Sequence, residues 1–216
     1  MNLWIALTSG FRGVVWLEAS FRLREKPRRP PALTLTACLV LAACLLVQLR
    51  YPQALELFDR NAGEIRVGEW WRLVTALFFQ DGWLAGGSVN ILLLFAIGNL
   101  AEQVRSRPEW LLIAAGGALA GELLGLRWEP VGAGNSIVTC ALAGSLIQLR
   151  SFRKASVSSK LLWITAIAIS SVPITRRDIH GAAAAIGFLV GLTKPVRIRP
   201  RRENLCVTAS ASEPSQ

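Results

Sequence analysis

Ser136 and His180 carry the side chains of this sequence best suited to covalent chemistry. Each stands at the start of an apolar segment, Ser136 in the turn Gly134-Asn135-Ser136 and His180, the only histidine, shortly after Asp178. A serine hydroxyl becomes a nucleophile when a neutral imidazole removes its proton, and the imidazolium then returns that proton to a leaving amine. The two residue types therefore indicate nucleophilic catalysis if the fold brings them together.

Two further residues fit that chemistry. Gly134 allows the chain to turn tightly before the apolar segment, so that free N–H groups of a first helical turn point to where an oxyanion would form. The amide of Asn90 would add another donor. Each residue also has a plainer explanation, because Ser and Asn within membrane helices often bond to carbonyls or join two helices, and a lone His near a helix end can be merely interfacial.

The composition indicates whether these segments are surrounded by water or by lipid. The chain is 52% hydrophobic, yet it has 24 Lys and Arg against 14 Asp and Glu. The basic residues lie in short segments between long apolar runs, whereas a nucleic-acid-binding protein would spread them over a folded surface. We therefore expect a membrane protein with no nucleic-acid partner. The four cysteines show no paired or metal-like spacing.

Six apolar stretches are candidates to cross a bilayer, which takes roughly 20 residues of helix. The last three are short, and all should be helical because lipid cannot satisfy backbone polar groups. They are Pro31–Leu49, Trp83–Glu102, Trp110–Leu126, Asn135–Leu149, Leu161–Ile174 and Asp178–Leu192.

Basic residues orient this bundle, since Lys and Arg favour cytoplasmic segments. With the N-terminus inside, 17 of the 24 fall inside and 7 outside; the outer ones are Arg50, Arg60, Arg66, Arg72, Arg127, Arg176 and Arg177. The sequence thus predicts an all-α membrane protein with six helices and both termini cytoplasmic. Six tryptophans lie near predicted helix ends, as an interfacial belt requires: Trp70, Trp71, Trp83, Trp110, Trp128 and Trp163.

Three regions follow from this reading. We expect residues 1–30 to form a basic cytoplasmic arm on the inner leaflet, residues 31–193 to form the membrane domain, and residues 194–216 to form a basic, then disordered, cytoplasmic tail.

Small residues predict which helices touch. Ser136, Cys140 and Gly144 share one face of the fourth span, and His180, Ala183, Gly187 and Gly191 share one face of the sixth. Faces of small residues let backbones approach closely. Both spans run from outside to inside, so this contact would bring Ser136 toward His180.

The sequence at this point resembles the rhomboid family of intramembrane serine proteases. Gly134-Asn135-Ser136 matches the family's Gly-x-Ser, with Gly144 eight residues on, and His180, Ala183 and Gly187 match its His-x-x-Gly-x-x-x-Gly, with Ala in place of the first Gly. The similarity extends over residues 31–193 and includes the Trp-Arg element Glu69-Trp70-Trp71-Arg72 and the spacing of Asn90, Gly98 and Glu102.

Two positions depart from the family. Its members usually carry an oxyanion-binding His four residues before the helix-two Asn, where this chain has Gly86, and an aromatic residue packing on the catalytic His is replaced by Cys140. Asp178 is expected to point away from His180 and to serve as a helix N-cap, so a Ser136–His180 dyad is the simpler arrangement.

The resemblance implies an intramembrane serine endopeptidase that cleaves transmembrane segments of single-span proteins near the outer face. It would use Ser136 and His180, with Asn90 and Gly134 supporting the oxyanion and with neither cofactor nor metal, in a bacterial-type inner membrane. The alternative, kept open by Gly86, is a catalytically inactive rhomboid-like protein that binds transmembrane helices. A small transporter is disfavoured because Glu122 looks isolated.

Overall fold

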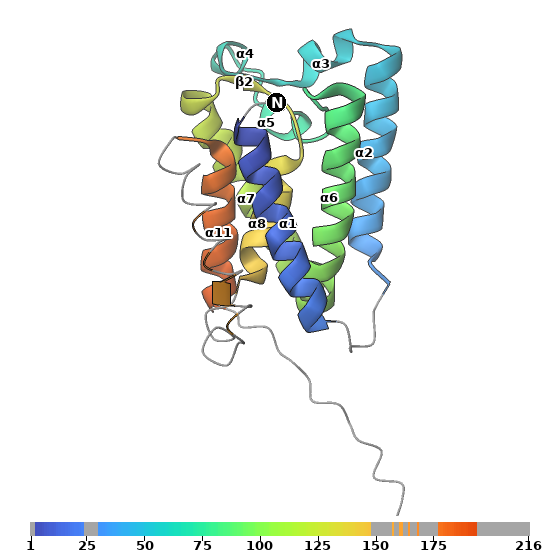
Figure 1. Ribbon diagram of the computed structural model, residues 1–216. Coiled ribbons are helices and arrows are strands. Elements are labelled where there is room, and N and C mark those ends of the chain that lie inside the picture. Colours follow the sequence, from blue (N-terminus) through green and yellow to red (C-terminus); the bar gives the residue numbers. More distant parts are fainter. Residues whose placement is uncertain are drawn as a thin grey trace, which may run out of the picture.

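A computed structural model describes residues 3–23, 30–147 and 177–193, with single positions at 157, 160, 161, 164 and 168. It is a bundle of helices with short helices and one small strand pair at its upper end as drawn in Figure 1. In chain order the described elements are α1 (Leu3–Leu23), α2 (Ala32–Arg50), α3 (Gln53–Phe58), β1 (Arg60–Asn61), α4 (Ala62–Arg66), α5 (Arg72–Thr75), α6 (Trp83–Val104), α7 (Arg107–Trp128), β2 (Val131–Gly132), α8 (Ser136–Leu146) and α11 (Ile179–Thr193).

Five of the six predicted spans correspond to helices α2, α6, α7, α8 and α11, with ends within a few residues of those expected. Three of them, α2, α6 and α7, are long and apolar enough to cross a membrane, while α8 and α11 are shorter apolar helices. The fifth span, 161–174, lies largely outside the described residues, as does the tail from 194. The six-helix count and the orientation of the termini therefore stay predictions.

The carboxylate of Glu102 caps the start of helix α2. Glu102, near the end of α6, accepts the N–H groups of Leu33 and Thr34 at 3.2 and 3.0 Å and the Thr34 hydroxyl at 3.0 Å. These bonds satisfy donors that the first turn of a helix leaves free. A Cβ on Gly98 would lie 2.8 Å from the Thr34 methyl. Gly98 and Glu102, two of the α6 residues that match the family's spacing, therefore hold α6 against α2.

Helix α7 starts with a capping box. Ser106 accepts the N–H of Glu109, and the Glu109 side chain accepts the N–H of Ser106 in return. Trp110 lies near the start of this helix, as expected. It is only 4% exposed, because its indole is turned toward α6 and donates to the carbonyl of Gly98 at 3.2 Å.

Helix α8 lies at the centre and contacts α1, α6, α7 and α11. Its contact with α11 is the closest in the bundle: a Cβ on Gly144 would lie 2.1 Å from the Ala184 carbonyl oxygen, and one on Gly187 would lie 1.8 Å from that of Ala141. Only glycine permits these two backbones to meet. The predicted close approach of the fourth and sixth spans is therefore confirmed.

A buried ion pair ties the small strand pair to α7. Arg60 lies in β1, which pairs antiparallel with β2, and it contacts the Glu122 carboxylate at 3.1 Å with both side chains 2% exposed. Its Nε also donates to the Glu129 carbonyl at 3.0 Å. The sequence suggested that Glu122 is isolated, but it is not. The guanidinium of Arg60 balances the charge of its carboxylate.

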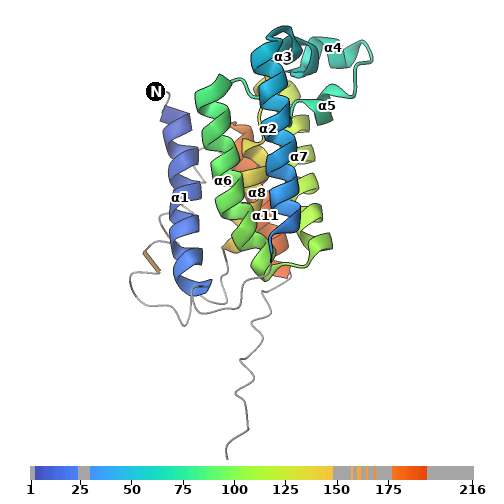
Figure 2. The ribbon, with the colours of Figure 1, turned by 90° about the vertical axis from the view of Figure 1, so that its right-hand side faces the viewer.

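Helix α1 differs most from expectation. Instead of lying apart on the inner leaflet, it packs lengthwise along α6 and α8, with its N-terminal end at the upper end of the bundle (Figures 1 and 2). Phe11, Val15 and Ala19 recur at helical spacing and are buried in the contact. That stripe was hidden in the sequence by the charge at Arg12, which is itself only 3% exposed.

Candidate active site

Ser136 and His180 meet at the upper end of the α8–α11 contact. Ser136 is the first residue of α8 and His180 lies in the first turn of α11, so the close glycine contact below them fixes their separation. Ser136 Oγ lies 2.7 Å from His180 Nε2, and both residues are half-buried. The distance is that of a strong hydrogen bond, with the geometry required of a nucleophile and its base.

Asp178 completes a line of three groups. Its Oδ1 lies 2.7 Å from His180 Nδ1 and accepts the His180 backbone N–H at 2.8 Å. The second bond agrees with the expected N-cap, but the expectation that the carboxylate points away from the imidazole is wrong. Asp178 precedes the helix and is not bound by helical spacing, so one oxygen reaches both the backbone and the ring.

The charge of Asp178 selects the imidazole tautomer. Asp178 Oδ1 accepts the backbone N–H of His180, a bond that favours the ionised carboxylate. An ionised carboxylate only accepts hydrogen bonds, so Nδ1 of a neutral ring carries the proton. Nε2 then presents its lone pair to the hydroxyl of Ser136.

Amide side chains form the other half of the site. Asn90 Nδ2 donates to Gln80 Oε1 at 3.0 Å, and Gln80 Nε2 donates to Asn135 Oδ1 at 3.0 Å. Gln48 fixes the backbone of Gln80 through bonds of 2.7 and 2.9 Å. Gln48 and Gln80 are completely buried. Sequence reasoning missed both, and the only signal was a pair of uncharged polar residues at the ends of apolar runs.

Gly134 sets the approach of the chain to Ser136. Its φ of +151° is a conformation that favours glycine, and its N–H donates to the Ala76 carbonyl at 2.9 Å. A Cβ here would lie 3.7 Å from both Asn90 Nδ2 and Ser136 Oγ. Asn90 Nδ2 and Ser136 Oγ thus lie on either side of the same turn, where both could contact one substrate carbonyl.

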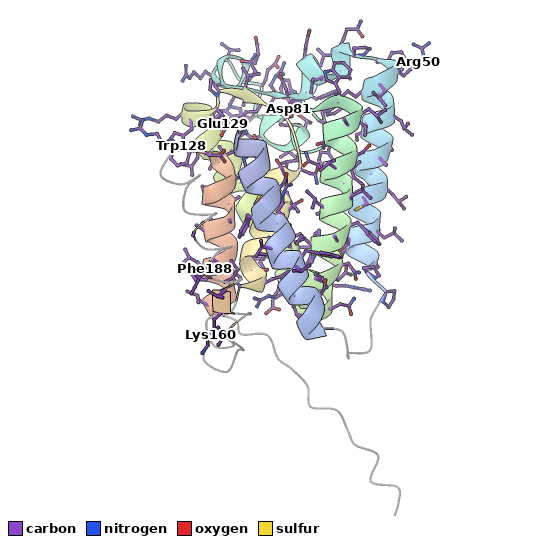
Figure 3. All side chains as sticks on the ribbon, viewed as in Figure 1. Arg50, Asp81, Trp128, Glu129, Lys160 and Phe188 are labelled. Carbon is purple, nitrogen blue, oxygen red and sulfur yellow. The ribbon has the colours of Figure 1, made fainter. Side chains whose placement is uncertain are left out.

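A cavity of about 790 Å³ opens onto these groups. Its lining includes Ser136, His180, Asn90 and Gly134 together with Gly86, and Figure 3 shows three other lining residues at the upper end of the bundle: Asp81, Trp128 and Glu129. Burial raises the pKa of Asp81, partly offset by backbone hydrogen bonds. A space of this volume is large enough for a short peptide segment.

One group of residues in the described part of the chain has the composition of a metal site. Glu129, Asp178 and His180 place one potential ligand atom each within 4.8 Å of one another. Both imidazole nitrogens, however, are within 2.7 Å of Ser136 and Asp178, and Glu129 Oε1 accepts the N–H of Ile179 at 3.2 Å. Hydrogen bonding to the ring and to the start of α11 accounts for all three residues.

Comparison with known proteins supports the sequence resemblance. A family model described as the Rhomboid domain matches residues 67–200, which is more than half of the chain. The match includes every residue of the Ser136–His180–Asp178 line and the amides of Asn90, Gln80 and Asn135. No curated protein and no solved structure matched the chain.

Proposed function

Since this chain belongs to the rhomboid family, whose members are generally intramembrane serine proteases, we propose that it is an intramembrane serine endopeptidase. The observation that carries the proposal is the line from Ser136 Oγ through His180 to Asp178, with both separations 2.7 Å. This is the arrangement of a nucleophile, a base and a group that orients the base.

The first half of the reaction forms an acyl-enzyme. Ser136 Oγ attacks the carbonyl carbon of the scissile peptide bond while its proton passes to His180 Nε2. The carbonyl oxygen becomes an oxyanion, which Asn90 Nδ2 and backbone N–H groups at the start of α8 stabilise. The C–N bond then breaks, and the amine leaves with the proton from Nε2. Asp178 stabilises the transient imidazolium without itself taking the proton.

The second half regenerates the serine. Water gives a proton to Nε2 and attacks the ester carbon, and the second tetrahedral intermediate expels Ser136 Oγ, which recovers that proton. This step needs water at the site. The cavity beside Ser136 and His180, with its polar lining, supports such access.

The substrates of the proposed enzyme are transmembrane segments of single-span proteins, cut near the outer face of the membrane. A helical segment must unwind locally before its carbonyl can reach Ser136, so small or helix-breaking residues at the cut site are favoured. A bacterial inner membrane is the proposed location. The resemblance to the family also suggests that Pro173 loosens the fifth predicted span to admit a substrate; this residue lies outside the described residues.

A second candidate function is a catalytically inactive rhomboid-like protein that binds transmembrane helices. Gly86 favours it, because this residue lines the cavity at the position where the family usually has an oxyanion-binding His. The same cavity would hold a helix without proton transfer.

Fluorophosphonate labelling of the purified protein in detergent separates the two. The expected result is one label, located on Ser136 by peptide mass spectrometry and lost in Ser136→Ala. An active rhomboid protease serves as the positive control. A folded protein that stays unlabelled while the control reacts would favour the helix-binding function.

Asp178→Asn is expected to slow this labelling by about 10²-fold or more, because an amide no longer selects the Nδ1–H tautomer or stabilises the imidazolium. The measurement is the pseudo-first-order rate constant at fixed reagent concentration. Glu129→Gln is the matched control, since it exchanges a neighbouring carboxylate for the same amide outside the line of three groups. Equal rates for Asp178→Asn and wild type would leave the dyad as the sufficient arrangement.

A further inference from the structure

The buried guanidinium of Arg12 enters the site from α1. Arg12 Nη1 donates to Asn90 Oδ1 at 3.2 Å, and Nη2 donates to Ser9 Oγ at 3.3 Å. Arg12 and Ser9 line the same cavity as Ser136 and His180. Helix α1 thereby supplies the wall of the cavity that faces Asn90.

We propose that Arg12 is a positioning residue for the reaction, which orients and polarises Asn90 as an oxyanion donor and compensates for the glycine at position 86. This inference rests on the proposed protease function. It assigns to helix α1 a role that differs from the membrane-surface arm expected from the sequence for residues 1–30.

The first argument concerns the orientation of the Asn90 amide. A guanidinium only donates hydrogen bonds, so its contact fixes Oδ1 toward Arg12 and turns Nδ2 toward Gln80 and Gly134. The amide nitrogen has two hydrogens. One is taken by Gln80 Oε1, and the second remains for an oxyanion next to Ser136. Without Arg12, only the bond to Gln80 Oε1 would oppose a half-turn rotation of the amide, which would present an oxygen to that oxyanion.

The second argument is electrostatic. A hydrogen bond from a charged donor is stronger than a neutral one, and it draws electron density from the amide, which makes Nδ2 a better donor. The charge itself also lies near the place where the oxyanion develops. In a site of low dielectric such a charge stabilises the transition state more than it would in water.

The third argument is the space at Gly86. A Cβ there would have no neighbour within 4 Å, and Gly86 lines the cavity together with Asn90 and Arg12. The resemblance to the family places an oxyanion-binding His at this position. The structure thus has a cationic donor on one side of Asn90 and an open volume where the usual imidazole would be.

Packing alone does not explain an arginine here. Phe11, Val15 and Ala19 provide the apolar contact of α1 with α6 and α8. Burying a guanidinium removes it from water at a large cost in free energy, so an apolar residue at position 12 would serve a purely structural helix better. The buried charge of Arg12 contacts Asn90, the proposed oxyanion donor, which favours a role for Arg12 in the reaction.

The test compares Arg12→Gln with wild type in the full-length protein. We expect the rate constant for labelling of Ser136 to fall about 10- to 10²-fold, since one oxyanion donor is weakened but not removed. With a transmembrane peptide substrate, kcat should fall while KM stays within about 3-fold, because the interaction acts on the transition state. Arg66→Gln, an exposed arginine of α4, is the matched control.

Two variants separate positioning from packing. Phe11→Ala removes the neighbouring contact of α1 but leaves the guanidinium, so it should lower thermal stability more than kcat. Adding Gly86→His to Arg12→Gln should restore at least about 3-fold in kcat, because an imidazole then supplies the missing donor. Rescue of this kind is not expected for a loss of packing.

Three results with the variants would overturn the inference. Faster labelling of Arg12→Gln would mean that α1 obstructs the site. Equal loss of kcat in Phe11→Ala and Arg12→Gln would mean that Arg12 matters for packing only, and an unchanged rate in Arg12→Gln would mean that it does not matter. If wild type itself is unlabelled, both this inference and the proposed function fail, whereas a labelled wild type isolates the test of Arg12.

Discussion

His180→Ala is expected to lower the rate constant for fluorophosphonate labelling of Ser136 by at least about 10⁴-fold, since loss of the base costs a serine hydrolase up to about 10⁶-fold in kcat. In the structure Nε2 is 2.7 Å from Ser136 Oγ. Without the ring, no base removes the hydroxyl proton as Ser136 Oγ attacks phosphorus and fluoride leaves. The measurement is labelling over hours at several reagent concentrations, with quantification of the Ser136 peptide.

The control for this variant lies on the same helix. Leu189→Ala shortens a side chain of α11 that is 56% exposed, so it tests whether changes to α11 matter in general. We expect it to label at the wild-type rate. If His180→Ala labels as fast as Leu189→Ala while remaining folded, Ser136 is not activated by the imidazole and the proposed mechanism fails.

Gly187→Ala is expected to be the most disruptive of the small substitutions in the bundle. The new methyl would lie 1.8 Å from the Ala141 carbonyl oxygen, so α8 and α11 must separate. Overpacking of this kind costs on the order of 3 kcal/mol. It also draws His180 away from Ser136, because both lie at the upper end of the same two helices. Thermal unfolding in detergent and the labelling rate measure the two effects.

Gly116→Ala is the matched control for this prediction. It makes the same chemical change in a helix, but its methyl would come no closer than 3.8 Å to a neighbour. Since alanine favours helix over glycine by about 1 kcal/mol, this variant should be neutral or slightly stabilising. Comparable destabilisation by both variants would show that the α8–α11 contact has no special role.

The sequence predicted the parts of the fold that depend on local patterns. Apolar length located five of the helices, and small residues at helical spacing predicted that α8 packs closely on α11. Those two features bring Ser136 and His180 together. The contact could be anticipated because each helix carries its small residues on a single face.

Of the residues that were missed, Gln80 and Arg12 depend on contacts distant in the chain, whereas Asp178 depends on its position just outside a helix. Asp178 reaches the imidazole from a position just outside the helix, where 3.6-residue spacing does not apply. Gln80 acquires its role from Gln48, Asn90 and Asn135, on three other segments. Arg12 was read as a surface charge because its partner lies 78 residues away. No local pattern encodes such pairings.

The amide network around Gln80 divides the site into two halves with different responses to acidity. Gln48, Gln80, Asn90 and Asn135 have no titratable side chains, and the guanidinium of Arg12 keeps its proton throughout the ordinary pH range. The donors for the oxyanion therefore keep the same form in acid and in base. Among the residues assigned to the reaction, proton transfer is confined to the Asp178–His180–Ser136 line, although Asp81 and Glu129 also line the cavity. A change of pH that alters His180 therefore leaves the amide donors in the same form.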